Sequence, residues 1–312
     1  MRISTLKTAA VLLCMGATAG AAAQIMAPAQ ITPDMVDTRH FSPQTAEEFV
    51  PVNTEYLVNT DAFGMARTST RETGTEFQFA LQPGANYAIL FKCLSTAEEV
   101  TIPDTIHFQG AVYPVEEIYK QAFAARTKLK TLNFGKNIKR IDSQAFMACN
   151  TLSTINLNEG LLEIGDQAFY MFLKNVKSLT LPSTVETLGE RAFSGCNISG
   201  EFIINKNLKT IGGGAFAGNS ITGFYINENG NDYFTSKDGV LYTKDGQSLV
   251  VFPPALVGEE LTIPDGTVKI APYALSNSTK VKKINLPESL KEIGNFAFRS
   301  CNLQDITLGL ST

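Results

Sequence analysis

The chain has 312 residues, with 26 Lys and Arg against 30 Asp and Glu, which leaves a net charge of −4. A mildly acidic chain with no run rich in Lys and Arg lacks the basic surface that nucleic-acid binding requires. After the first 23 residues, no stretch approaches the roughly 18 consecutive apolar residues of a transmembrane helix, so a membrane-spanning protein is not expected either.

Residues 1–23 have the three parts of a secretory signal peptide. Arg2 and Lys7 supply the positive charge, Ala9–Met15 forms an apolar core too short to span a bilayer, and Ala21–Ala23 offers a small-residue cleavage site. We expect cleavage after Ala23. The protein is therefore expected to be exported, either secreted or held at the cell surface, with the periplasm as the alternative.

Residues 24–75 are predicted to form an irregular leader or linker, because Pro28, Pro33 and Pro43 interrupt any long element. Residues 76–117 differ, because two strand-like runs occur there around a Pro-Gly turn. We interpret this segment as a β-rich N-terminal cap. A repeat array needs a cap, because an open end would expose its core.

Over residues 118–312 one six-residue phrase returns, as in Ile141-Asp-Ser-Gln-Ala-Phe146 and Ile164-Gly-Asp-Gln-Ala-Phe169. Its phenylalanines are 23 or 24 residues apart, except across one longer gap. A fixed period in the twenties indicates a solenoid. We interpret the phenylalanines as structural anchors buried in each coil: Phe123, Phe146, Phe169, Phe193, Phe216 and Phe298.

Each coil also contains a pattern for one short strand. Two apolar residues separated by a single position precede each anchor, as Ile155 and Leu157 precede Phe169, and this alternation is the strand period. A Pro or Asn often follows and ends the strand. We therefore predict a repeat solenoid with a parallel β-sheet and short helical or 3₁₀ turns near each Ala-Phe pair.

The consensus L-x-x-I-x-L-P-x-x-L-x-x-I-G-x-x-A-F-x-x-C resembles the BspA-like leucine-rich repeat family over roughly residues 76–312. The resemblance implies a leucine-rich-repeat-like fold. It also implies a surface or secreted protein, of a kind common in Bacteroides-type bacteria and in some mucosal protists. The function that it implies is adhesion to host matrix proteins or to other bacteria.

After the fifth copy of the phrase the chain is longer than one coil requires. Two Asp-Gly pairs occur there, and the second, Asp245-Gly246, lies between two runs that can pair, Val240–Tyr242 and Leu249–Val251. We expect a hairpin insertion near 226–257 that projects from the solenoid.

Three cysteines occupy the same place in their coils, three residues after the anchor: Cys149, Cys196 and Cys301. Coils stack about 4.8 Å apart, so Cys149 and Cys196, which are two coils apart, lie roughly 10 Å from each other. A disulfide needs Cα atoms within about 7 Å. We therefore expect no disulfide among these cysteines, each of which fills a small apolar slot.

No motif predicts catalysis or a cofactor. His40 and His107 lie in different segments, and the usual zinc, nucleotide and hydrolase motifs are absent from the sequence. Gly212–Gly214 resembles a phosphate-binding loop only in isolation, because it occupies the turn of a repeat. Asn227–Asp232 offers oxygen ligands for calcium but lacks the spaced acids and closing Glu of a calcium loop. We expect neither an enzyme nor a bound metal or cofactor.

The residue between the two apolar strand positions points away from the core, and these residues form a narrow, mostly polar row down the stack. This strand row consists of Asn133, Asn156, Thr180, Ile203, Thr262 and Asn285. It is either a solvated face or a protein-binding surface, because solenoid sheets present long, shallow faces. Tyr170–Leu173, in the one 24-residue coil, is a second candidate, either core or partly exposed.

Two functions remain open from the sequence. The first is an exported, non-enzymatic binding scaffold, a monomer that recognises a protein or glycan at the cell surface. The second is an accessory substrate-capture or assembly module of an envelope complex. The absence of Trp argues against a dedicated sugar-binding platform, which usually needs aromatic stacking.

Overall fold

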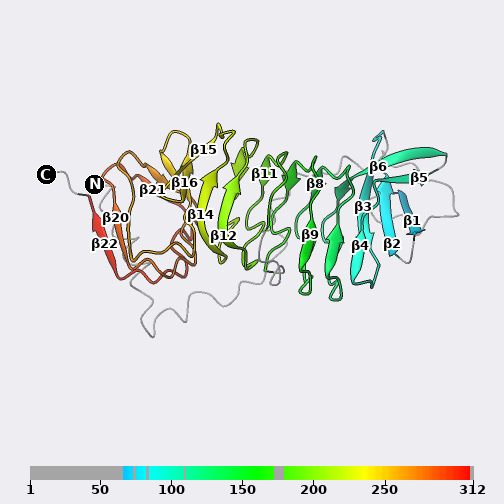
Figure 1. Cartoon of the computed structure of the whole chain (residues 1–312), viewed down its shortest axis with the longest axis horizontal. Helices are drawn as coiled ribbons and strands as arrows, with labels where there is room; N and C mark the ends of the chain where they lie inside the picture. Colours follow the sequence, from blue (N-terminus) through cyan, green and yellow to red (C-terminus); the bar gives the residue numbers. More distant parts are fainter. Residues whose placement is uncertain (1–65, 73–74, 82–83, 109, 172–178, 310–312) are drawn as a thin grey trace.

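The computed structural model describes residues 66–72, 75–81, 84–108, 110–171 and 179–309. Over this part the chain winds into an elongated stack of coils, with the N-terminal strands at one end and β22 (Asp305–Leu308) at the other (Figure 1). The predicted signal peptide and most of the predicted leader lie outside the described residues.

A first row of strands carries the Ile or Leu that begins each six-residue phrase. Ile118 pairs in register with Ile141, Ile141 with Ile164, and the row continues through Leu188 and Ile211. These repeat strands are parallel, as predicted. The sheet runs in the order β1 (Ala66–Glu72), β2 (Thr75–Leu81), β3 (Ala88–Cys93), β6 (Ala111–Ile118), β8 (Arg140–Ile141), β10 (Glu163–Ile164), β11 (Thr187–Leu188) and β13 (Thr210–Ile211), and β5 (Thr105–Phe108) pairs with β6.

A second row carries the two alternating apolar residues of each coil. Leu132 pairs in register with Ile155, and Phe202 with Phe224. Unlike the single sheet that the repeat predicts, this row is divided into three short parallel sheets. They are β4 (Glu99–Thr101), β7 (Thr131–Asn133) and β9 (Thr154–Asn156); β12 (Ser199–Ile204) and β14 (Ser220–Ile226); and β18 (Glu260–Thr262), β20 (Lys283–Leu286) and β22.

The anchor phenylalanines form a column inside the stack. The first five, from Phe123 to Phe216, are each 0% exposed. The Phe146 ring lies 4.9 Å from the Phe123 ring and 4.7 Å from the Phe169 ring, between centroids. Phe298 is only partly buried, because no further coil covers it among the described residues.

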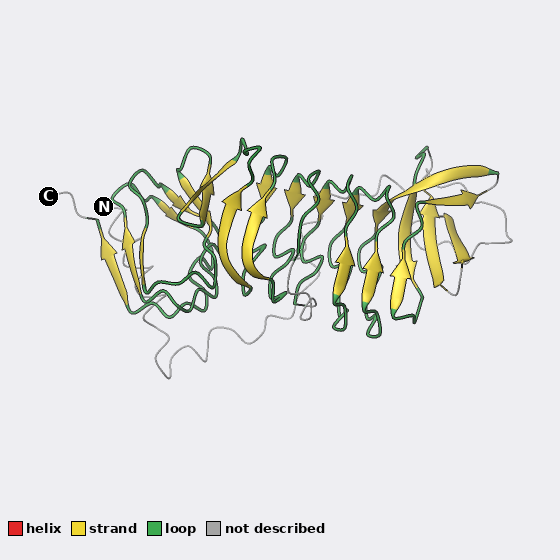
Figure 2. Cartoon of the chain, in the orientation of Figure 1, coloured by secondary structure: helices red, strands yellow, loops and turns green. Residues whose placement is uncertain are grey.

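The Ala-Phe segments are tight turns, so the prediction of short helical or 3₁₀ elements there was wrong. In Figure 2 the described chain consists of strands and loops, without a helix. Each coil that carries the six-residue phrase places residues in the left-handed region, such as Gln144 (φ 55°) and Ala148 (φ 64°), and such residues interrupt a right-handed helix. The Phe146 N–H instead donates to the next coil, to the Ala168 carbonyl at 3.1 Å.

The N-terminal end differs from the predicted leader at one place. The segment 24–75 was expected to be irregular, but β1 lies within it and pairs antiparallel with β2, from Ala66 opposite Leu81 to Glu72 opposite Thr75. The segment is polar, yet its threonines favour extended backbone, and β2 supplies an edge to pair with.

The insertion contains a coil that the repeat pattern did not reveal. The Phe252 N–H donates to the Ala274 carbonyl at 2.8 Å, as the Phe193 N–H donates to the Ala215 carbonyl at 2.9 Å. Phe252 is buried and precedes Leu275 by one repeat period. It therefore occupies the anchor slot of a coil that lacks the six-residue phrase.

The predicted hairpin is present, but it does not simply project from the solenoid. Strand β16 (Val240–Thr243) pairs antiparallel with β17 (Ser248–Val251), with Leu241 opposite Val251. Strand β17 also pairs in parallel with a repeat strand, so the hairpin continues the solenoid sheet and buries its apolar side chains. This sheet runs in the order β15 (Phe234–Lys237), β16, β17, β19 (Lys269–Ile270) and β21 (Glu292–Ile293).

The repeat cysteines form no disulfide, as predicted. Each sulfur instead lies against the preceding anchor residue. Cys149 Sγ donates to the Phe123 carbonyl at 3.1 Å, and Cys196 Sγ to the Phe169 carbonyl at 2.9 Å. In another coil the Asn219 side-chain amide fills this slot. At Cys149, Cys196 and Asn219 the slot therefore holds a hydrogen-bond donor as well as a small side chain.

The buried thiols of Cys93 and Cys149 should be unreactive in the folded protein. Burial raises the pKa of Cys149 to about 12 and the pKa of Cys93 to about 11. Because the thiolate is the reactive form and both pKa values are raised, a disulfide reagent at pH 8 should modify Cys93 and Cys149 only after denaturation. Spectrophotometric titration of denatured, unreduced protein cleaved after Ala23 should then find every thiol. Finding two thiols fewer than the number of cysteines would reveal a disulfide and contradict the coil geometry.

Candidate functional site

The predicted strand row lies on the outer side of the second row of strands, in three separate pieces. Asn133 and Asn156 lie on the first short sheet, Ile203 on the second, and Thr262 and Asn285 on the third. The structure therefore brings these residues together pairwise rather than as one continuous ladder.

The polar ends of the strand row are engaged with one another. Asn156 Nδ2 donates to Asn133 Oδ1 at 2.6 Å, and Asn133 Nδ2 donates to Thr101 Oγ1 at 3.2 Å. At the other end Asn285 Nδ2 donates to Thr262 Oγ1 at 2.9 Å. These hydrogen bonds occupy some of the donor and acceptor atoms of the side-chain amides. The ends of the row therefore offer a partner fewer hydrogen-bonding groups than their composition suggests.

The centre of the row is apolar. Ile203 is 51% exposed and pairs in register with Tyr225, which is 39% exposed. A Cβ on Gly223 would lie 2.7 Å from Tyr225 Cε2, so the Tyr225 ring lies against the strand where only glycine leaves room. Sequence reasoning missed Tyr225 because no copy of the six-residue phrase follows it at the repeat spacing, so no repeat strand was assigned there. The alternation in Phe224-Tyr225-Ile226 was the signal that could have found it.

A second outward row was also missed, two residues before the strand row. It includes Glu260 and Lys283, whose carboxylate and ammonium groups lie 3.0 Å apart. Asn285 Nδ2 donates to Glu260 Oε1 at 2.7 Å. This hydrogen bond, together with Lys283, lowers the pKa of Glu260 below its usual value. The strand period places residues i and i+2 on one face, so this row was predictable in principle.

Two predicted positions lie apart from these rows. Thr180 is exposed but belongs to no strand in the described part of the chain. Of the second candidate, Tyr170 is half-buried and Met171 is exposed, whereas Phe172 and Leu173 lie outside the described residues.

The turns carry another stack of side chains, in which Arg191 and Tyr273 are half-buried and Phe296 is exposed. The Arg191 guanidinium lies 4.4 Å from the Tyr273 ring centroid and donates to the Tyr273 hydroxyl. The Tyr273 ring stacks on Phe296 with centroids 5.1 Å apart. Because Tyr273 is covered by Arg191 on one side and by Phe296 on the other, it offers no open aromatic face to a sugar.

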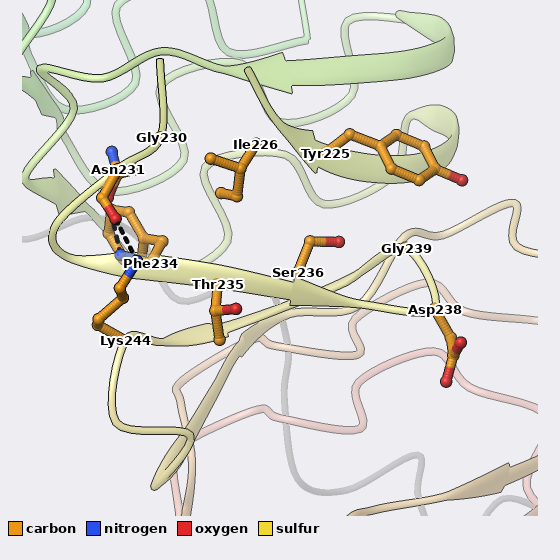
Figure 3. A pocket seen from close by; sticks show the side chains of 10 residues that line it. All are labelled: Tyr225, Ile226, Gly230, Asn231, Phe234, Thr235, Ser236, Asp238, Gly239 and Lys244. Atoms are coloured by element: carbon orange, nitrogen blue, oxygen red, sulfur yellow. Dashed lines mark hydrogen bonds between the residues drawn. The ribbon is translucent and has the colours of Figure 1, made fainter. Parts of the chain in front are cut away.

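A cleft of about 620 Å³ opens between β14 and β15. Figure 3 shows Ile226 and Ser236 on opposite sides of it, with Lys244 and Asp238 at opposite ends. Tyr225 belongs both to this cleft and to the apolar centre of the strand row. The cleft is lined by Tyr225, Ile226, Gly230, Asn231, Phe234, Thr235, Ser236, Asp238, Gly239 and Lys244.

The Asn227–Asp232 loop is organised by the core rather than by a cation. Asn231 is buried, its Nδ2 donates to the Asn205 carbonyl at 2.8 Å, and its Oδ1 accepts the Phe234 N–H at 2.7 Å. Both ends of this amide are therefore occupied. Among the described residues, no group of three His, Cys, Asp or Glu side chains is placed to hold a metal ion.

The sequence matches the BspA type leucine rich repeat region in six copies, over residues 116–237 and 257–312, which is more than half of the chain. The protein belongs to the BspA-type leucine-rich repeat family. The resemblance seen in the sequence is thereby confirmed, including the coil period. No curated protein matches this BspA-type chain.

Solved structures share the fold of this BspA-type chain at low identity. The pneumococcal vaccine antigen PcpA is 24% identical, with a TM-score of 0.56 over 77% of this chain and 70% of that one. A leucine rich cell surface protein from Faecalibacterium prausnitzii is 23% identical, with a TM-score of 0.54 over 77% and 76%. A leucine-rich repeat protein from Eubacterium ventriosum is 18% identical, with a TM-score of 0.59 over 78% and 68%.

Within its described residues, this BspA-type chain has no helical segment with the length and hydropathy needed to cross a bilayer.

Proposed function

We propose that this chain is an exported, non-enzymatic scaffold that binds a protein or glycan partner at the cell surface. The observation that carries the proposal is the exposed Ile203–Tyr225 pair at the centre of the strand row. Large apolar side chains surrounded by polar ones are typical of the few residues that dominate binding energy at an interface.

Four further features support this function. The predicted signal peptide over residues 1–23 favours export, and solenoid strands present long binding faces. PcpA is described as a vaccine antigen and the Faecalibacterium protein as a cell surface protein, which favours a similar location for this chain. Asp238 and Lys244 lie at opposite ends of the cleft (Figure 3), and Ser236 Oγ donates to the Phe224 carbonyl. These side chains therefore do not form a set of acid, base and nucleophile, which favours binding over catalysis.

The test is a binding assay with immobilised protein cleaved after Ala23, challenged with a panel of host matrix proteins and with an envelope extract. A matrix-protein partner supports adhesion, whereas a co-purifying bacterial protein supports an accessory role in an envelope complex. The partner is then titrated against variants of the strand row by surface plasmon resonance.

Ile203→Arg is expected to weaken the partner's affinity at least about tenfold, because a central apolar anchor contributes more than about 1.4 kcal/mol. The matched control is Met147→Arg, since Met147 is also an exposed large apolar residue, at 37%, but lies in a turn beside Phe146. If folded Ile203→Arg protein binds like the parent, the centre of the row is only a solvated face. The triple variant Asn133→Arg, Asn156→Arg, Asn285→Arg then tests whether the polar ends contribute.

A further inference from the structure

The cleft between β14 and β15 is closed at both ends. At one end the Phe224 N–H donates to the Gly239 carbonyl at 2.8 Å, and Ser236 Oγ donates to the Phe224 carbonyl at 2.5 Å. At the other end the 227–233 loop joins the two strands and is held by the buried Asn231. The cleft is therefore a short recess rather than a channel. Its volume of about 620 Å³ lies within the usual range for small-ligand sites, roughly 300–1,000 Å³.

The β14 wall presents unpaired backbone groups to the cleft. In a parallel pair, successive residues direct their backbone groups to opposite edges of the strand. The Asn227 N–H donates to the Ile204 carbonyl on β12 at 3.1 Å, and Ile204 is in register with Ile226. Asn227 therefore faces β12, whereas Ile226 directs its N–H and carbonyl into the cleft. Among the described residues, neither group of Ile226 has a hydrogen-bond partner.

The β15 wall has the same property. The Lys244 N–H donates to the Tyr233 carbonyl at 2.8 Å, which fixes the alternation of hydrogen-bonded pairs along the β15–β16 hairpin. Ser236 consequently directs its backbone N–H and carbonyl away from β16 and toward β14. Each wall thus offers one backbone donor and one backbone acceptor. An apolar occupant would leave them buried without partners, at a cost in free energy, so the cleft requires an occupant with both donors and acceptors.

The rest of the lining adds an apolar surface and a cation. The Tyr225 ring lies against Gly223, is 39% exposed, and lines the cleft together with Ile226. At the loop end, Lys244 Nζ donates to the Asn231 carbonyl at 2.8 Å. An ammonium group has three donors, and Lys244 forms no ion pair with another described residue. Its positive charge therefore remains for an anionic ligand group.

We propose that this cleft binds the terminal, carboxylated sugar unit of a glycan, such as a hexuronic acid or a sialic acid. A sugar ring carries hydroxyl groups around its rim, so it can bond to backbone groups on both walls at once. A protein side chain enters with a single polar end and reaches fewer of them. The closed ends favour a terminal unit, because an internal unit would need two exits for its chain. The inference rests on the proposed binding function and names the chemistry of the partner at this cleft.

The lining also orients the sugar. Its C–H face packs on Tyr225 and Ile226, which removes apolar surface from water, and its carboxylate pairs with Lys244. Asp238 lies at the opposite end (Figure 3), where it accepts a hydroxyl hydrogen and repels the carboxylate. One terminal unit requires a single ring to pack on, not the extended platform against which the absence of Trp argues.

The probes are the methyl glycosides of glucuronic acid and of N-acetylneuraminic acid, with methyl glucoside as the neutral control that lacks the carboxylate. Each is titrated into isotope-labelled protein cleaved after Ala23 and followed by two-dimensional NMR. At least one acidic sugar is expected to bind with a dissociation constant below about 10 mM, with the largest shifts at the Ile226 and Ser236 amides. Methyl glucoside should bind at least about fivefold more weakly. The two acidic probes distinguish a uronic acid from a sialic acid.

Lys244→Gln tests the cation. It should weaken binding of the acidic sugar about five- to tenfold and remove the preference over methyl glucoside. The matched control is Lys237→Gln, because Lys237 is an exposed lysine of the same hairpin that does not line the cleft. This control should bind both sugars like the parent. The comparison of acidic and neutral sugars needs no variant, so it decides the matter if Lys244→Gln does not fold.

The proposal is overturned if neither acidic sugar binds with a dissociation constant below about 10 mM, if the shifts lie outside the cleft, or if methyl glucoside binds as tightly. A protein partner that shifts Ile226 and Ser236 while no acidic sugar binds would assign the cleft to a protein side chain instead.

The outcomes separate this inference from the proposed function, because Ile203 does not line the cleft. A partner that is lost in Ile203→Arg while no acidic sugar binds removes the sugar site and leaves the proposed function intact. Binding of an acidic sugar, with no effect of Ile203→Arg on a captured partner, keeps the sugar site and removes the role of the strand row.

Discussion

Replacing Phe146 with Ala is expected to lower the free energy of unfolding by about 3–5 kcal/mol. Phe146 is 0% exposed and its ring is stacked between those of Phe123 and Phe169, at 4.9 and 4.7 Å. Truncation removes both ring contacts and leaves a cavity in the centre of the column. Neighbouring coils depend on each other for burial, so the backbone cannot collapse around the site without separating from the next coil.

Urea denaturation followed by circular dichroism measures this change. The control Met147→Ala lies in the same coil, but Met147 is exposed, so it should cost less than about 1 kcal/mol. A loss for Phe146→Ala as small as that of the control would show that the column does not support the fold.

Gly212→Ala should be the second large destabilisation, about 3 kcal/mol. A Cβ at this position would lie 2.4 Å from the Glu190 backbone nitrogen and 2.4 Å from the Gly189 carbonyl carbon. Both are backbone atoms of the preceding coil, so no side-chain rotation relieves the clash. The coils must move apart and weaken the Gly212 N–H bond to the Leu188 carbonyl, which is 2.8 Å long.

Gly213→Ala is the matched control, because the nearest atoms to its Cβ would be Pro272 Cβ and the Pro272 carbonyl oxygen, both at 3.3 Å rather than 2.4 Å. Gly213→Ala should lower the stability clearly less than Gly212→Ala does, as measured by thermal unfolding in differential scanning calorimetry. Equal losses would point to a general intolerance of this turn rather than to the close approach of two coils. The glycine run therefore serves coil stacking, as its place in the repeat predicted.

The repeat pattern alone identified the coil and its interior. Phe146, Phe169 and Phe193 could be placed in one buried slot because their neighbours repeat with them, and burial depends on a residue's position within its own coil. The same logic placed Cys149 and excluded a disulfide. It did not reveal that the Cys149 thiol donates a hydrogen bond, because the accepting carbonyl, that of Phe123, belongs to the preceding coil.

The repeat pattern also led to a wrong prediction for the turns. A helical reading of the Ala-Phe segment is reasonable from composition, since a run such as Gln144-Ala145-Phe146 contains no helix breaker. Gln144 and Ala148 instead adopt left-handed backbone conformations, which direct N–H groups such as that of Phe146 to the adjacent coil. Hydrogen bonding between coils outweighs the local preference for a helix. The position of the neighbouring coil cannot be deduced from the sequence of the segment alone.

The sequence by itself thus determined the period, the core slots and the family, because these follow from which side chains recur at a fixed spacing. Only the tertiary structure decided that Phe252 completes a hidden coil, that β17 joins the sheet, and that Tyr225 stands beside Ile203. It alone also decided that β14 and β15 diverge into a cleft. The physical reason is that a side-chain pattern records which face of a strand is buried, whereas the pairing of strand edges depends on backbone groups that every residue carries.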